Sequence, residues 1–124
     1  MAKLVYIIDD SAACAETLEI ALESVNGIVT RSILGSRAAI VRMKQSPEEI
    51  AAVITDLHLS TISGFDLIRE LRADARFAHT PIVLISGDSD PLLPERALAV
   101  GANAFFSKPY SPSAVRRKLE QLLW

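Results

Sequence analysis

Cysteine is nearly absent from this chain of 124 residues, in which Cys14 stands alone. No disulfide can form within the chain, and no metal site can be built from cysteine thiolates. Apolar runs of membrane-spanning length are lacking, and the first residues do not form a cleavable signal peptide. We therefore expect a soluble cytoplasmic protein in a reducing compartment, with no membrane attachment.

A strong charge of either sign is missing as well. The chain has 13 lysine and arginine residues against 15 aspartate and glutamate residues, with no block of like charge. This balance does not indicate a nucleic-acid surface, so we expect no direct contact with nucleic acid. Repeats, low-complexity segments and linkers are absent too. Half of the residues are hydrophobic, and the length suits a single domain over residues 1–124.

Two patterns alternate along the chain. Short apolar runs, several of them rich in β-branched residues, predict strands buried on both faces. Between them, apolar residues recur with helical spacing, and capping residues such as Ser11 and Ser111 precede two of these segments. The predicted strands are residues 3–8, 28–33, 51–56, 82–86 and 103–107, and the predicted helices are residues 12–25, 36–43, 65–75, 95–101 and 112–122.

Five strands that alternate with five helices predict a fold of the α/β class, the flavodoxin-like doubly wound (βα)5 arrangement. Its five-stranded parallel sheet has the order 2-1-3-4-5, with helices on both faces. The run over residues 28–33 is more polar than the others, which favours the edge position that this order gives it.

The predicted order brings polar residues together at the carboxyl edge of the sheet. The residues that leave the strands there are Asp9, Asp10, Asp56, Ser86 and Lys108. Two carboxylates about 4 Å apart repel by roughly 4 kcal/mol at an effective dielectric near 20, so three together need a cation or protons. Carboxylates beside an open position suit Mg²⁺. With Lys108 and Ser86 as donors, the pocket is interpreted as a phosphoryl acceptor.

These residues, in this order and at these intervals, resemble a known family: the receiver domain of two-component response regulators, of the stand-alone chemotaxis-regulator type. The resemblance runs from Lys3 to the end of the chain. The motifs that carry it are Asp9-Asp10, Asp56-Leu57 with Gly64 eight positions after the acid, Ser86, and Lys108-Pro109.

The resemblance implies a role for each of these residues. Asp56 would be the phosphoacceptor, and Mg²⁺ would be held by Asp9, Asp10, Asp56 and the backbone carbonyl of His58. Lys108 would contact the phosphoryl group, and the Lys108-Pro109 bond would be cis. Ser86 would sense the phosphoryl group together with Phe105 at the aromatic switch position. His58 and Asp88 would tune the lifetime of the phosphorylated state.

The resemblance also implies partners. A histidine kinase or a histidine phosphotransfer protein would donate the phosphoryl group from a phosphohistidine. An output partner, whose identity the sequence does not give, would bind the face formed by residues 95–101, 103–107 and 112–122. A dimer formed on phosphorylation is a further expectation. We expect a signalling phosphoacceptor rather than an enzyme. Such a protein catalyses only its own phosphorylation and dephosphorylation.

Some positions depart from the family pattern. Leu59 and Ser60 stand where Met-Pro is frequent, which predicts a less rigid loop. Gly87 stands where alanine is usual and adds backbone freedom. Phe105 has no hydroxyl to hydrogen-bond at the surface. None of these departures removes a catalytic group, so we expect them to affect the output step more than phosphorylation.

Two other functions fit the sequence less well. The first is a pseudo-receiver, a protein-interaction module not controlled by phosphorylation. The complete set of acids argues against it, because such a module does not need them. A small enzyme of the same fold, either a flavin carrier or a haloacid-dehalogenase-type phosphatase, fits less well. The adjacent carboxylates of Asp9 and Asp10 would repel a flavin phosphate, and the phosphatase family carries Asp-x-Asp at the first strand.

Overall fold

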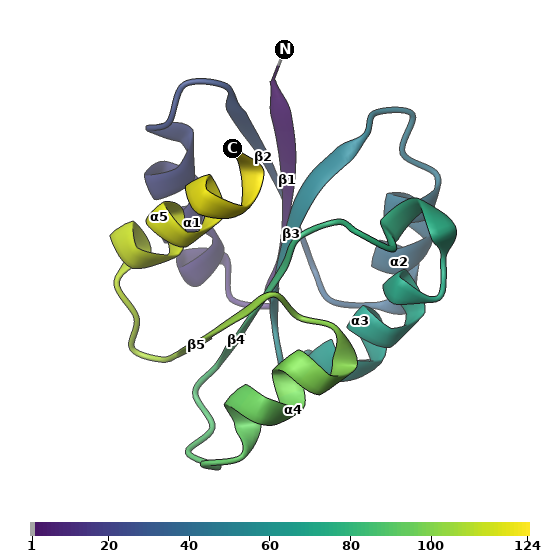
Figure 1. The fold of residues 1–124 in the computed structure, drawn as a ribbon, viewed down its shortest axis with the longest axis vertical. Helices are drawn as coiled ribbons and strands as arrows, with labels where there is room; N and C mark the ends of the chain where they lie inside the picture. Colours follow the sequence, from purple (N-terminus) through teal and green to yellow (C-terminus); the bar gives the residue numbers. More distant parts are fainter. Residues whose placement is uncertain (1) are drawn as a thin grey trace.

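The computed structural model describes residues 2–124 and contains one parallel five-stranded sheet (Figure 1). The strands lie in the order β2-β1-β3-β4-β5, which confirms the predicted doubly wound α/β arrangement. The elements are β1 (Lys3–Ile8), α1 (Ala12–Glu23), β2 (Ile28–Ile33), α2 (Arg37–Lys44), β3 (Ile50–Asp56), α3 (Gly64–Arg72), the 3₁₀ helix η1 (Ala75–Phe77), β4 (Ile82–Ser86), α4 (Leu93–Val100), β5 (Ala104–Ser107) and α5 (Pro112–Leu123). Within residues 2–124, no helix is long and apolar enough to cross a membrane.

Helices cover both faces of the sheet: α1 and α5 lie on one side, and α2, α3 and α4 lie on the other (Figure 1). The side chains of β1 alternate between the two resulting cores, as the two-residue period of a strand requires. Leu4, Tyr6 and Ile8 belong to the core under α2, α3 and α4. Val5 and Ile7 belong to the core under α1 and α5. The five positions of β1 that are buried, Leu4 to Ile8, are therefore all hydrophobic.

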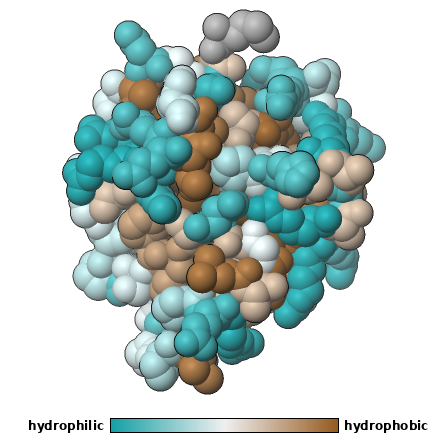
Figure 2. All heavy atoms as spheres, in the orientation of Figure 1, coloured by the Kyte–Doolittle hydropathy of each residue, from teal (hydrophilic) through white to brown (hydrophobic). Residues whose placement is uncertain are grey.

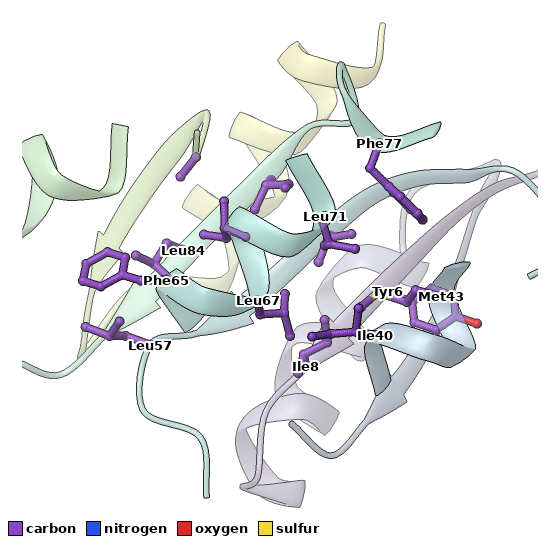
Figure 3. Packing of buried hydrophobic residues seen from close by; sticks show 14 of the residues in the cluster. Tyr6, Ile8, Ile40, Met43, Leu57, Phe65, Leu67, Leu71, Phe77 and Leu84 are labelled. Atoms are coloured by element: carbon purple, nitrogen blue, oxygen red, sulfur yellow. The ribbon is translucent and has the colours of Figure 1, made fainter. Parts of the chain in front are cut away.

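The core on the α3 side fixes the position of this helix against the sheet. Leu67 of α3, Ile40 of α2 and Ile8 of β1 lie close together, with Leu71 one turn further along α3 (Figure 3). All four side chains are buried, and burial of each contributes about 1.5–3 kcal/mol of hydrophobic stabilisation. This packing fixes the α3 end of the loop that joins β3 to α3.

Side-chain caps mark the helix starts that the sequence indicates. The hydroxyls of Ser11 and Ser111 accept hydrogen bonds from the backbone N–H groups of Cys14 and Ala114, as predicted for α1 and α5. The predicted end of the third helix, near residue 75, is wrong because α3 ends at Arg72. The Asp74 side chain caps the separate 3₁₀ helix η1 that follows.

The start of β1 and the end of α5 lie at the same edge of the sheet, away from the carboxyl ends of the strands (Figure 1). The ammonium group of Lys3 lies over the ring of Trp124, 5.4 Å from its centroid. This cation–π contact ties the start of β1 to the last residue of the chain.

Candidate functional site

The strand register places the predicted site residues at one edge of the sheet. Ile8 pairs with Thr55, so Asp9 and Asp56, the residues that follow them, leave neighbouring strands. Asp56 pairs with Ile85, and Ser86 pairs with Ser107 on the far side of β4. The carboxyl ends of parallel strands meet at this edge, where doubly wound folds bind their ligands.

Asp56 and Lys108 form a direct ion pair. The Lys108 Nζ atom lies 2.5 Å from Asp56 Oδ2, and the backbone N–H of His58 donates to Asp56 Oδ1 at 3.2 Å. Asp56 is buried, with 7% of its surface exposed. Burial lowers the pKa of Lys108, but the hydrogen bond and the charge of Asp56 outweigh it and leave this pKa raised. The Lys108-Pro109 bond is cis, as the resemblance implies.

Asp9 lies beside this pair with less compensation for its charge. Its Oδ1 atom accepts a hydrogen bond of 2.8 Å from the backbone N–H of Ser11. Burial raises the pKa of the Asp9 carboxyl, and the negative charge of Asp56 adds to the shift. The N–H of Ser11 and the charge of Lys108 offset this only in part. Two buried carboxylates therefore share one ammonium group.

Asp10 makes its hydrogen bonds to two loops. Its Oδ1 atom accepts a hydrogen bond of 2.9 Å from the N–H of Gly35, in the loop between β2 and α2. Its Oδ2 atom accepts two hydrogen bonds from Ser60, in the loop between β3 and α3: one from the N–H at 2.6 Å, the other from the hydroxyl. The hydroxyl of Ser60 is the main cause of the lowered pKa of Asp10.

The three acids are therefore not gathered as the sequence suggests. Within residues 2–124, no three His, Cys, Asp or Glu side chains are placed to hold one metal ion. The contacts of Asp10 explain this, because its carboxylate hydrogen-bonds to Ser60 and Gly35. Neither contact follows from the motifs in the sequence. The only signal for them was Ser60 itself, which carries an N–H and a hydroxyl where the family often has proline.

The remaining predicted residues lie around this centre. The buried Ser86 hydroxyl accepts a hydrogen bond of 3.0 Å from the N–H of Asp88. The side chain of Asp88 meets that of His58, with 3.0 Å between Oδ2 and Nε2, and both side chains are exposed. Phe105 is partly buried against the core under α2, α3 and α4.

Gly64 is the residue that allows α3 to approach the end of β3. A Cβ atom at this position would lie 2.9 Å from the Cα of Leu57 and would also collide with the carbonyl oxygen of Asp56. The Gly64 N–H donates to the carbonyl oxygen of Leu57 at 2.7 Å. The interval between Asp56 and Gly64 thus reflects a close backbone approach that any side chain would disturb.

A doubly wound α/β sheet that carries buried carboxylates and a lysine at its carboxyl edge defines a class of flavodoxin-like domains. The chain belongs to the response regulator receiver domain family, whose profile matches residues 5–120. Members of this family are phosphoacceptors of two-component signalling, which exchange signals with histidine kinases or phosphotransfer proteins and with output partners.

Individual relatives agree with this assignment. The chain is 33% identical over 111 residues to the transcriptional regulatory protein FixJ of Azorhizobium caulinodans; the match covers 90% of this chain and 50% of FixJ. The chain thus spans about half the length of this relative. A response regulator receiver protein from Pseudomonas putida is 31% identical, with a TM-score of 0.83 over 98% of this chain and 97% of that chain.

The fold is shared more widely than the sequence. The receiver domain of a sensor histidine kinase from Pseudomonas aeruginosa is 20% identical, with a TM-score of 0.85 over 99% of this chain and 98% of that chain. In that structure a magnesium ion is coordinated in the active-site cleft.

Proposed function

We propose that this chain is a phosphorylatable receiver domain over residues 1–124, which accepts a phosphoryl group on the carboxylate of Asp56. The donor is the phosphohistidine of a histidine kinase or of a histidine phosphotransfer protein. The observation that carries the proposal is the ion pair of 2.5 Å between buried Asp56 and Lys108 at the carboxyl edge of the sheet. The carboxylate that would act as the nucleophile is thus in direct contact with a positive charge.

The transfer exchanges one bond for another. A carboxylate oxygen of Asp56 forms a bond to phosphorus while the phosphorus–nitrogen bond of phosphohistidine breaks, and its electron pair remains on the imidazole. The product carries its negative charge further out than the free carboxylate does. Lys108 is already hydrogen-bonded to Asp56 and can follow this charge to the phosphoryl oxygens.

The chemistry of these side chains also suits a magnesium ion, which Asp9, Asp10, Asp56 and the backbone carbonyl of His58 would hold once Asp10 turns toward the other two acids. Hard oxygen ligands are those that Mg²⁺ prefers. The raised pKa of Asp9 supports the fit, because it reflects buried negative charge that Lys108 does not balance. A bound ion would supply positive charge to the carboxylates and to the phosphoryl oxygens. Asp10 could join them only by giving up hydrogen bonds to the two loops.

The output step would begin at Ser86. Its hydroxyl accepts a hydrogen bond from Asp88, and its own proton can be donated to a phosphoryl oxygen on Asp56. Such a hydrogen bond to a charged group contributes about 1.5–3 kcal/mol and would draw the loop after β4 toward the site. Phe105, on the strand next to Ser86, could then change its packing.

The face that responds would be α4–β5–α5, where an output partner binds. Hydrophobic surface is visible between α4 and β5 in Figure 2, and Leu98 of α4 is 60% exposed. A hollow of about 320 Å³ lies there, lined by residues that include Leu98, Phe105 and Lys118. An exposed apolar patch with a charged rim is typical of a protein–protein surface. A dimer formed on phosphorylation stays a prediction.

Incubation with acetyl phosphate and Mg²⁺ tests the proposal. The parent protein should gain the mass of one phosphoryl group, while Asp56→Asn should gain none and retain the circular dichroism of the parent. Asp66→Asn, which removes an exposed carboxylate on α3, is the matched control and should be labelled like the parent. An unlabelled parent would contradict the proposal and favour an interaction module that phosphorylation does not control.

A further inference from the structure

The hydrogen bonds of Asp10 set it apart from the other acids of the site. A carboxylate oxygen offers about two lone-pair directions. Both hydrogen bonds to Asp10 Oδ2 come from Ser60, through its N–H and its hydroxyl, and the N–H of Gly35 donates to Oδ1. A cation that binds Oδ2 therefore competes with Ser60 for the same electrons.

Burial does not force this arrangement. Asp10 and Ser60 are both exposed, so their hydrogen bonds form in the presence of water and can exchange for other partners. Asp9 and Asp56, in contrast, are buried and held at the ends of their strands. The position of Asp10 is thus the adjustable part of the acid set, and Ser60 supplies most of its hydrogen bonds.

The two loops that hold Asp10 also contact each other. The hydroxyl of Thr61 donates to the carbonyl oxygen of Gly35 at 3.2 Å. The side chain of Leu59 covers Gly35 so closely that a Cβ atom there would lie 2.5 Å from it. Release of Asp10 from Ser60 would therefore disturb the loop between β2 and α2 as well as the loop between β3 and α3.

We propose that Ser60 is a positioning residue that holds Asp10 away from Asp9 and Asp56 in the metal-free protein, and so weakens the binding of Mg²⁺. Alanine at this position retains the N–H donor, and proline retains neither donor. Metal binding and release of the loop between β3 and α3 are then one event. This inference rests on the proposed function, in which Asp10 is a ligand of Mg²⁺.

Titration with MgCl₂ at constant ionic strength, followed by amide chemical shifts, tests the inference without phosphorylation. Ser60→Ala should bind Mg²⁺ about 5-fold more tightly than the parent, the effect of one hydrogen bond of ordinary strength. Ser60→Pro should bind more tightly still, because it loses both donors. In the parent, Mg²⁺ should shift the amide signals of Gly35 and Ser60, which lose Asp10 as acceptor.

Two controls separate the hydroxyl from other effects. Ser60→Thr keeps a hydroxyl and should bind Mg²⁺ like the parent. Ser63 lies in the same loop, and its hydroxyl caps α3 and does not contact Asp10. The Ser63→Ala variant should therefore also bind Mg²⁺ like the parent. Circular dichroism of each variant establishes that it is folded.

The outcomes distinguish this inference from the proposed function. If the parent binds Mg²⁺ and is labelled by acetyl phosphate, but Ser60→Ala and Ser60→Pro bind no more tightly, the role of Ser60 is overturned and the proposed function stands. If neither the parent nor any variant binds Mg²⁺ or is labelled, both are overturned. Tighter binding by the Ser60→Thr variant as well would also overturn the role of the hydroxyl.

Discussion

Asp9 and Asp10 are neighbours in the chain, yet one lies in the buried part of the site and the other lies on its exposed edge. Burial raises the pKa of Asp9, whereas the hydrogen bonds from Ser60 and Gly35 lower the pKa of Asp10. The packed strand β1 holds Asp9 in place even though its charge is poorly compensated. Asp10, at the start of a loop, lies where donors stabilise its charge. The sheet therefore fixes the position of Asp9, whereas hydrogen bonds from two loops determine the position of Asp10.

Among variants that test this contrast, Lys108→Met should change the free energy of unfolding most. It removes the ammonium group that faces Asp9 and Asp56. Two buried carboxylates then repel each other, so the free energy of unfolding at pH 7 should fall by about 2 kcal/mol. Urea denaturation measures this change. The double variant Lys108→Met/Asp56→Asn should recover most of the loss, and failure to recover it would show that the lysine acts through packing alone.

A smaller loss is expected for Asp10→Ala in metal-free buffer. The variant removes the acceptor of three hydrogen bonds, so the free energy of unfolding should fall by about 1–2 kcal/mol. The pKa of Asp10 in the folded protein is lowered from 3.8, so this stabilisation is present above pH 3.8 and is lost as the pH falls through the lowered pKa. The two proteins should differ in stability at pH 6, and the difference should shrink as the pH falls below 3.8. A more stable variant at pH 6 would show that repulsion among the acids outweighs these hydrogen bonds.

Asp9→Asn should act in the opposite direction and raise the free energy of unfolding by about 1 kcal/mol at pH 7. The amide oxygen can still accept the N–H of Ser11, while the buried charge beside Asp56 is gone. The pKa of Asp9 in the folded protein is raised from 3.8, so its penalty is absent below pH 3.8 and grows as the pH rises through the raised pKa. Urea denaturation at pH 3 and pH 7 should show a gain only at pH 7. A gain of equal size at both values would point to a packing effect.

The smallest effect on stability is expected at the pair of His58 and Asp88. Both side chains are largely exposed, so Asp88→Ala should change the free energy of unfolding by less than about 0.5 kcal/mol. The lifetime of phosphorylated Asp56 should change nonetheless, because the pair lies beside the phosphoacceptor and affects the approach of water. Decay of the label after removal of acetyl phosphate measures this lifetime. A decay rate equal to that of the parent would exclude a role for Asp88.

The strand ends of the site could be predicted from the sequence because they follow from topology. Once the order β2-β1-β3-β4-β5 is known, Asp9, Asp56 and Lys108 must meet at one edge. The position of the Asp10 side chain could not be predicted in this way. It depends on hydrogen bonds to Gly35 and Ser60, which lie 25 and 50 residues further along the chain and are brought together only by the packing of two loops.

The contact between Lys3 and Trp124 has a practical consequence for engineering. Because Lys3 and Trp124 meet at the edge of the sheet away from the site, a short flexible linker can join these two positions. New ends opened in the exposed segment 47–49 would leave every strand intact. A circularly permuted receiver of this kind could carry a fluorescent reporter without covering Asp56.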